Sequence, residues 1–286
     1  MIIVTGASGQ LGSTIIERLL ERVPASDIGV SVRDVSKAQT LTDRGVRVRA
    51  GDFTDPSSLD HAFEGADQVL VVSAAIRGGG AFEANSAAID AAVRAGATRV
   101  LYTSHQAASP DSLFPPQTVH AATEQHLAQS GVAYTALRNG FYANSIGIHL
   151  ESALATGQIV VPEDGPVSWT AHSDLAEAAA IGLAQPATFD GLSAPLTASV
   201  ALDLGQVAEI LSGIVGREIV RVTVSDAEWR ASAIERGLPP MVADFSLGMF
   251  QAARRGEFDV VDPTLAGVIG HPTTPVETVL RELLRA

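Results

Sequence analysis

The segment Gly6-Ala7-Ser8-Gly9-Gln10-Leu11-Gly12 has the spacing G-x-x-G-x-x-G. It follows a short apolar run and precedes apolar residues at helical spacing, so we predict that it joins a strand to a helix. Glycines in such a turn let the backbone approach a pyrophosphate, whose charge is held by amides at the helix N-terminus. Glycines also make turns for steric reasons alone, but the strand-turn-helix context favours a dinucleotide site.

The selectivity for the nucleotide's ribose is expected ~20 residues further on, at the end of the second predicted strand. Arg33 there suits the extra 2′-phosphate of NADP, and Lys37 adds a second positive charge. Asp34 would instead hydrogen-bond a free ribose and repel the phosphate. The alternative is that Arg33 and Asp34 form a solvated surface pair. We therefore expect NADP(H) to be preferred and keep NAD(H) as the alternative.

Asp52 and Phe53 follow the third predicted strand. An acid and an aromatic ring at a strand's carboxyl end suit an adenine pocket, with Asp52 near the exocyclic amine. The alternative for Asp52 is a helix cap.

A proton donor is harder to find. Many short-chain dehydrogenases use Tyr-x-x-x-Lys, in which the lysine lowers the tyrosine pKa. The sole lysine of this sequence is Lys37, which precedes all three tyrosines, Tyr102, Tyr134 and Tyr142. The Tyr-x-x-x-Lys pair is therefore absent from this sequence. In the helix where the pair should fall, His120 and Glu124 stand at i,i+4, so His120 is a candidate proton donor oriented by Glu124. The alternative is an ordinary exposed helical pair.

This lack of a Tyr-Lys pair has a chemical consequence. A simple ketone becomes a basic alkoxide when a hydride adds to it, and without an acid its reduction is slow. A quinone becomes a delocalised phenolate, and a cationic dye becomes neutral. The sequence therefore favours acceptors whose reduced form is stable.

The composition excludes several other classes. The sequence has a formal net charge of −13 and no cysteine, which disfavours nucleic-acid binding and excludes thiol chemistry and disulfides. The histidines have no metal-ligand spacing. With no targeting signal or long apolar stretch, we expect a soluble, cytoplasmic protein. Its expected partner is a small-molecule acceptor rather than a membrane, and it is a monomer or homodimer.

The elements that must position these residues alternate through the first half of the 286-residue chain. Strands are predicted at 2–5, 28–32, 46–49, 68–73, 99–104 and 132–137, with helices between them. This alternation predicts an α/β fold, a Rossmann-like doubly wound parallel sheet. After about residue 140 the pattern weakens, which indicates a smaller C-terminal α+β lobe. We place a nucleotide-binding domain at 1–145 and a substrate-side lobe at 146–286, some segments of which return to the sheet. In the lobe, Ser225–Glu228 and Thr274–Glu277 read as capping boxes.

Taken together, these features resemble the NmrA-like atypical short-chain dehydrogenases, among them reductases of quinones and triphenylmethane dyes. Besides the glycine-rich segment, the matching motifs are Val23-Pro24-Ala25-Ser26, Val32-Arg33, Tyr134-Thr135, Leu137-Arg138-Asn139-Gly140 and Ile269-Gly270-His271-Pro272-Thr273-Thr274. The resemblance implies a Rossmann domain, a small C-terminal lobe, NADP(H) binding and hydride transfer to quinone-like or extended aromatic acceptors. Where relatives carry Asn after the arginine, this chain has Asp34.

The resemblance also implies cofactor contacts beyond the glycine-rich segment and Arg33. These are Ser73, Ala74 and Ala75 after the fourth strand and the loop that contains Asn139, Gly140, Phe141 and Tyr142. From the position of the strand ends we add Ser104 as a cofactor contact. The expected acceptor pocket, at the carboxyl ends of strands four to six, involves His105, Phe114, Phe141 and Trp169, although Phe114 and Trp169 fit the core equally well. Tyr142 is a candidate for orienting the acceptor oxygen.

The sequence thus predicts an NAD(P)H-dependent oxidoreductase that acts without a Tyr-Lys pair. A non-catalytic NADP(H)-sensing regulator, as some NmrA-like proteins are, is the alternative. An enzyme of this kind oxidises NADPH when quinones are supplied, whereas a sensor only binds it.

Overall fold

The computed structural model describes residues 1–76 and 79–285. The chain divides into two compact units. The first comprises Met1–His105, Val119–Asn139 and His172–Ala194, and the second comprises Gln106–Thr118, Gly140–Ala171 and Pro195–Ala286. This division differs from a single break after residue 145, because the chain crosses between the units several times.

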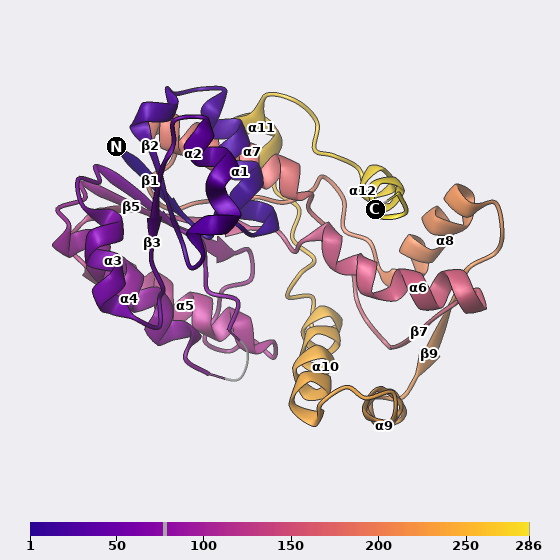
Figure 1. Ribbon diagram of the computed structural model, residues 1–286. Helices are drawn as coiled ribbons and strands as arrows, with labels where there is room; N and C mark the ends of the chain where they lie inside the picture. Colours follow the sequence, from indigo (N-terminus) through magenta and orange to yellow (C-terminus); the bar gives the residue numbers. More distant parts are fainter. Residues whose placement is uncertain (77–78, 286) are drawn as a thin grey trace. The chain divides into compact units, whose positions relative to one another are not determined.

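A seven-stranded sheet forms the centre of the first unit, in the order β3-β2-β1-β4-β5-β6-β8 (Figure 1). All neighbouring strands pair in parallel. The strands are β1 (Ile2–Thr5), β2 (Ile28–Val32), β3 (Arg47–Ala50), β4 (Gln68–Val71), β5 (Arg99–His105), β6 (Ala133–Asn139) and β8 (Gly191–Leu192). The first six follow the order of a dinucleotide-binding sheet, which confirms the predicted Rossmann-like fold.

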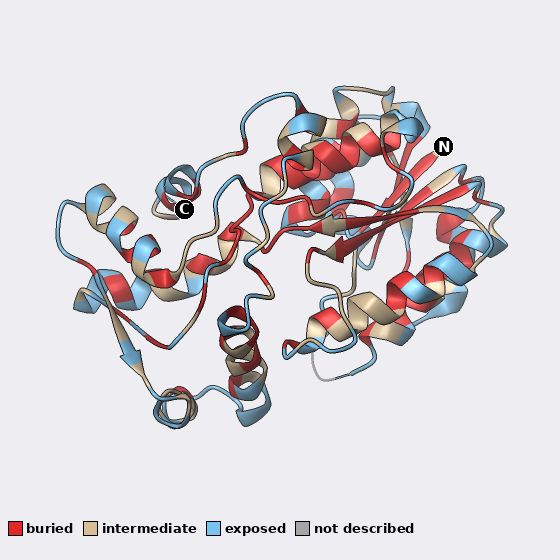
Figure 2. Cartoon of the chain, turned by 180° about the vertical axis from the view of Figure 1, so that it is seen from behind, coloured by how far each residue is buried: buried red, intermediate tan, exposed pale blue. Residues whose placement is uncertain are grey.

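Helices cover both faces of this sheet. Figure 1 shows α3, α4 and α5 together on one face and α1 and α7 on the other. The helical segments are α1 (Gln10–Leu20), η1 (Ala25–Asp27), η2 (Val35–Ala38), α2 (Gln39–Asp43), α3 (Pro56–Phe63), α4 (Ala81–Arg94), α5 (Pro115–Gln129), α7 (His172–Ala184) and η4 (Pro186–Thr188). Their buried sides face the strands (Figure 2). One core cluster joins Ile3 and Val69 of the sheet to Phe63, Ile89 and Leu127 of α3, α4 and α5.

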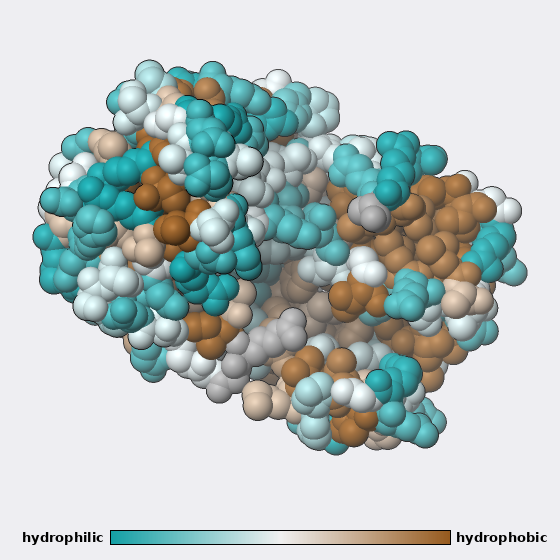
Figure 3. All heavy atoms as spheres, in the orientation of Figure 1, coloured by the Kyte–Doolittle hydropathy of each residue, from teal (hydrophilic) through white to brown (hydrophobic). Residues whose placement is uncertain are grey.

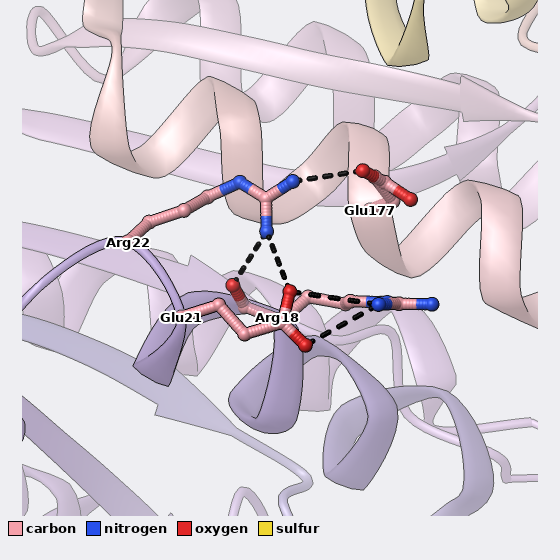
Figure 4. Close-up of polar contacts among 4 residues, drawn as sticks. All are labelled: Arg18, Glu21, Arg22 and Glu177. Carbon is pink, nitrogen blue, oxygen red and sulfur yellow. Dashed lines mark hydrogen bonds and ion pairs between the residues drawn. The ribbon is translucent and has the colours of Figure 1, made fainter. Parts of the chain in front are cut away.

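Helices α1 and α7 are far apart in sequence, and an ion pair links them. Arg22, just after α1, donates to Glu177 of α7 at 2.8 Å, and Glu21 faces the same guanidinium (Figure 4). Both side chains of the Arg22–Glu177 pair are largely buried. The contact holds α1, the helix that follows the glycine-rich turn, against α7, although Arg22 and Glu177 lie 155 positions apart in the sequence.

The second unit is mostly helical. Its elements are η3 (Ala143–Ile146), α6 (Gly147–Thr156), β7 (Gln158–Pro162), α8 (Leu204–Val215), β9 (Val220–Val224), α9 (Asp226–Glu235), α10 (Pro240–Arg254), α11 (Thr264–Ile269) and α12 (Val276–Leu283). Strands β7 and β9 pair in parallel. Figure 3 shows hydrophobic residues on the face that carries α6 and α8, where Ile148 is 74% exposed.

Several predicted boundaries are wrong. Strand β4 ends at Val71 rather than at residue 73, and β6 spans Ala133–Asn139 rather than 132–137. The capping box at Ser225 is confirmed. The one expected at Thr274 is absent, because α12 begins at Val276, and Pro275 at the N-cap position has no side-chain hydrogen-bonding group. Among the described helices, none is long and apolar enough to cross a membrane.

Candidate functional site

The glycine-rich turn between β1 and α1 is tightly closed. Gly6 has a φ of +64°, in the region that favours glycine, and its carbonyl accepts from the Gly9 amide at 2.9 Å. A Cβ on Gly12 would lie 2.2 Å from the Gly6 carbonyl oxygen. Helix α1 can therefore approach the turn this closely only with glycine at position 12.

The start of α1 offers backbone donors. Gly9 is its N-cap residue and supplies no side-chain cap, and the first N–H groups of a helix have no acceptor within the helix. Ser8, Gly9 and Gln10 are exposed. A Cβ on Gly9 would meet only the Gly6 oxygen, at 3.3 Å, so the space beyond this glycine is open to a ligand. Open backbone amides at a helix N-terminus, reached over glycines, fit the diphosphate of a dinucleotide.

The end of β2 presents an unpaired cation. Asp34 accepts from the Ser36 amide at 3.0 Å and its hydroxyl at 2.6 Å, and these bonds hold the pKa of the Asp34 carboxyl below its usual range. The Lys37 ammonium lies 4.0 Å from the same carboxylate. Arg33 is exposed and has no hydrogen bond or ion pair within the described chain. The alternative of an Arg33–Asp34 pair is thus wrong, and Arg33 can meet a phosphate.

Asp52 stabilises a turn after β3. Its carboxylate accepts from the amide and hydroxyl of Thr54 at 2.9 and 2.8 Å, and these bonds lower the pKa of Asp52. Asp55, not Asp52, stands at the N-cap of α3, so the helix-cap alternative for Asp52 is wrong. Phe53 packs against the core cluster below α3. The adenine-pocket role of Asp52 and Phe53 stays a prediction.

The loop after β4, which contains Ser73, Ala74 and Ala75, is held through its backbone. The amide of Val72 donates to the Thr5 hydroxyl at 2.9 Å. The next two amides donate to side chains of β5 and α4, namely Thr103 and Asn85, each at 2.8 Å. These acceptors were not predicted. A polar residue on the apolar face of an expected helix, as Asn85 is, was the available signal.

His120 and Glu124 belong to separate hydrogen-bond networks. His120 Nδ1 lies 2.8 Å from the Tyr102 hydroxyl. Glu124 accepts from Arg138 at 2.9 and 2.7 Å and from Ser104 at 2.6 Å. The expectation that Glu124 orients His120 is therefore wrong, because a guanidinium on the neighbouring strand occupies both carboxylate oxygens.

His105, at the end of β5, and His120, on α5, are both neutral at physiological pH. Burial lowers the pKa of His120 to about 4. It also lowers the pKa of His105 well below its usual value, with a smaller contribution from the charge of His120. Their rings stack with centroids 6.1 Å apart. As a neutral imidazole, His120 is a weak hydrogen-bond donor rather than a strong acid.

Asn139 ends β6 beside His105 in the register of the sheet. Its side chain is buried, and its Oδ1 has no hydrogen-bond partner within the described residues. Such a buried acceptor calls for an explanation, and a donor on a bound molecule would supply one.

The remaining predicted residues lie in the second unit. Phe141 packs against Phe114 and Trp169, with ring centroids 6.0 and 5.3 Å apart. Trp169 is 2% exposed and donates its indole N–H to the Leu202 carbonyl at 2.9 Å. For Trp169 the structure favours the core role over the substrate role. Tyr142 is half-buried, and a Cβ on Gly140 would lie 2.1 Å from the Thr170 hydroxyl.

The comparisons with known proteins agree with this geometry. A family model described as NAD(P)H-binding matches residues 6–186. The chain is 35% identical over 277 residues to quinone oxidoreductase 2 of Escherichia coli (strain K12), across 96% of this chain and 95% of the relative. The chain belongs to the NAD(P)H-binding family.

Two solved structures of reductases resemble this chain over nearly its whole length. The NADPH-dependent quinone oxidoreductase of Escherichia coli, crystallised with NADPH, superimposes with a TM-score of 0.93 and 34% identity, over 99% of this chain and 100% of its own. The triphenylmethane reductase of Citrobacter sp., crystallised with NADP(H), gives 0.90 and 32% over the same shares. This member of the NAD(P)H-binding family is an NAD(P)H-dependent oxidoreductase.

The residues described above fit the nicotinamide cofactor of this family. The glycine cradle and the start of α1 would hold the diphosphate, and Arg33 would lie near the adenine ribose. When bound, the reduced cofactor supplies two electrons and a proton equivalent as a hydride. Within the described residues no cluster of side chains could hold a metal ion.

Proposed function

We propose that this enzyme reduces quinones or other extended aromatic acceptors with NADPH as the electron donor, and that it does so without a Tyr-Lys pair. The observation that carries the proposal is the state of His120. It occupies the helix in which the usual proton donor is expected, yet its pKa of about 4 leaves it neutral at pH 7.

The chemistry of the acceptor follows from that state. A ketone needs a proton at its oxygen as the new C–H bond forms, and a neutral imidazole bonded to Tyr102 is a poor source of one. A quinone delocalises the new negative charge over its ring as a phenolate, which takes a proton from water afterwards. A cationic dye loses its charge and needs no proton. Such acceptors make the least demand on the chain's own acids.

The preference for NADPH rests on Arg33. Its guanidinium is exposed at the end of β2, where the adenine ribose is expected, while Asp34 is engaged by Ser36. A guanidinium binds phosphate oxygens through charge-assisted hydrogen bonds. An Asp34 carboxylate that already accepts two hydrogen bonds competes weakly for a ribose hydroxyl.

The proposed contacts to the acceptor come from Tyr142, which is half-buried, and from the Phe141–Phe114 ring pair. We assign Tyr142 the role of orienting the acceptor oxygen. Replacing it with phenylalanine is then expected to raise the KM for quinones, because the orienting hydrogen bond is lost, and to change kcat by less than about twofold, since no proton passes through its hydroxyl.

An anaerobic assay of NADPH oxidation tests the proposal. The acceptors are a benzoquinone, a naphthoquinone, a triphenylmethane dye and, as the contrasting class, a simple ketone. We expect turnover with the first three and a rate with the ketone lower by at least ~100-fold, the usual contribution of a missing general acid. Gly9→Val, which obstructs the cradle, is the control for non-enzymatic reduction.

Two outcomes would contradict the proposal. If the protein binds NADPH but oxidises it with none of the acceptors, the chain is a sensor of the cofactor. If the ketone is reduced as fast as the quinones, a proton donor other than His120 must operate.

A further inference from the structure

Three consecutive amides after β4 donate to side chains of three different elements. Val72, Ser73 and Ala74 pair with Thr5, Thr103 and Asn85, and all three acceptor residues are 1% exposed. Backbone amides that would otherwise continue the sheet are thus held from within the first unit. Side-chain acceptors therefore set the path of this loop.

The loop lies directly behind the glycine-rich turn. A Cβ on Gly6 would lie 3.2 Å from the Cβ of Val72, and Thr5, which receives the Val72 amide, immediately precedes Gly6. A displacement of residues 72–74 would therefore reach the diphosphate cradle.

Of the three acceptors, Asn85 also donates a hydrogen bond to a second partner, away from the loop. Its Oδ1 accepts from Ala74, and its Nδ2 donates to the Tyr102 hydroxyl at 3.2 Å. That hydroxyl lies 2.8 Å from His120 Nδ1. One buried amide thus connects the loop to an imidazole on α5.

We infer that Asn85 is a positioning residue of the oxidoreductase site, which fixes the loop 72–74 through its carbonyl and the tautomer of His120 through its amino group and Tyr102. The inference rests on the proposed function only where it assumes that the site reduces a quinone-like substrate, since the hydrogen bonds of Asn85 involve no such substrate.

The direction of the hydrogen bonds favours one tautomer. Because an amide nitrogen only donates, Asn85 occupies one lone pair of the Tyr102 oxygen, and this favours a hydroxyl that donates to His120 Nδ1 over one that accepts from both neighbours. Nδ1 is then the acceptor, and the proton of the neutral ring sits on Nε2. The low pKa of His120 keeps the ring neutral, so that only one of its two nitrogens carries a proton. The result is an imidazole with its N–H donor at Nε2, in a ring that stacks on His105.

Two variants separate the two halves of this role. Tyr102→Phe cuts the link to His120 and leaves the contact between Asn85 and Ala74 in place. Asn85→Leu removes both contacts with little change in volume. Tyr134→Phe is the matched control, because Tyr134 is a half-buried tyrosine on the neighbouring strand β6, outside this network.

The first measurement is the imidazole ¹⁵N spectrum of His120, assigned by its loss in His120→Gln. We expect the wild type and Tyr134→Phe to show an Nε2–H ring with a hydrogen-bonded Nδ1. In Tyr102→Phe and Asn85→Leu the Nδ1 signal is expected to shift toward a mixture of tautomers. An unchanged His120 spectrum in Tyr102→Phe would overturn the inference, even if Asn85→Leu fails to fold.

The second measurement is NADPH affinity by fluorescence titration without any acceptor. Asn85→Leu is expected to weaken binding by roughly tenfold, the low end of the loss when a buried donor such as the Ala74 amide is left unpaired. Tyr102→Phe and Tyr134→Phe should bind within about twofold of the wild type. A folded Asn85→Leu protein with wild-type affinity would refute the positioning of the loop. Since neither measurement uses a quinone, failure of the proposed function would leave both results standing.

Discussion

At the edge of the sheet where the strands begin, the buried guanidinium of Arg99 donates to the Gly182 and Phe189 carbonyls at 2.7 and 3.0 Å and to the Thr135 hydroxyl at 2.8 Å. Gln68 in turn donates to the Leu183 carbonyl in the last turn of α7. We call this the amino edge. Its polar groups find their partners within the first unit, and its cation lies at a helix C-terminus, where positive charge is favourable.

The opposite edge, where the strands end, is the carboxyl edge. There the first amides of α1 lack a side-chain cap, Arg33 forms no hydrogen bond or ion pair within the described chain, and the Asn139 Oδ1 is buried without a donor among the described residues. Both edges belong to the same sheet. The polar groups named at the amino edge close the fold, whereas these three groups at the carboxyl edge stay available to a ligand.

The largest effect is expected at the amino edge. Arg99→Met removes the donor to several buried acceptors, so we expect a loss of about 3 kcal/mol in unfolding free energy, the upper end for groups left unsatisfied. Denaturant titration measures it. NADPH affinity of the folded variant should stay unchanged, because the guanidinium lies at the far end of the strands from the glycine-rich turn. A weaker affinity with unchanged stability would reverse the assignment of the two edges.

The next effect belongs to the carboxyl edge. Gly9→Val places a branched side chain where the diphosphate is expected, and its nearest protein neighbour is the Gly6 oxygen. We expect NADPH affinity to fall by about 100-fold, or ~2.7 kcal/mol. Calorimetric titration measures the affinity, and thermal unfolding without cofactor should remain close to that of the wild type. Normal binding by this variant would remove the glycine-rich turn from the site.

A smaller effect distinguishes the two cofactors. Arg33→Ala is expected to weaken NADPH binding by about 2 kcal/mol, the range of a charge-assisted hydrogen bond, and to leave NADH binding nearly unchanged. Parallel titrations with both nucleotides check it, and Lys37→Ala is the companion variant for the second cation. An equal loss for both nucleotides would show that Arg33 does not contact the 2′-phosphate.

The two edges also differ in how far the sequence predicts them. The glycine spacing and the six strands of the first half follow from local patterns, so the cradle and the parallel sheet were predicted from residues 2–137, whereas the strand order comes from the structure. Arg99 and its acceptors come from β5, β6, α7 and the residue that follows η4. No local sequence pattern relates Arg99 to acceptors that lie 83 and 90 positions later in the chain. From the sequence alone, an arginine at the start of a strand is expected at the surface.

The pairing of His120 shows the same limit within the site. Spacing along α5 places His120 and Glu124 on one face of the helix. Arg138 from β6 takes up the Glu124 carboxylate, and Tyr102 from β5 takes up the imidazole. Helical spacing predicts which side chains are neighbours, but a stronger charged partner from another strand decides which of them bond.

The smallest of these effects is the pH dependence that His120 adds to stability. Its pKa is about 4 in the folded protein, below the ordinary value of 6.5. Above pH 6.5 the ring is neutral in both states. As the pH falls from 6.5 toward 4, the unfolded chain takes up a proton that the folded chain does not, so the unfolding free energy decreases.

His120→Gln should remove this contribution. Between pH 7 and pH 4.5 we expect the variant to lose about 1.5 kcal/mol less unfolding free energy than the wild type, roughly half the full linkage value because His120 as a residue is half-buried. Denaturant titrations at the two pH values measure the difference, with the exposed His61→Gln as control. Of the groups around the ring, His105 is a titratable side chain that stacks on it and Tyr102 contacts it, so the difference between variants isolates His120 better than the wild-type curve alone. If both variants follow the wild type, His120 is hydrated in the folded protein and free to act as an acid. The carboxyl edge would then hold a proton donor, whereas the proposed preference for quinones assumes that it has none.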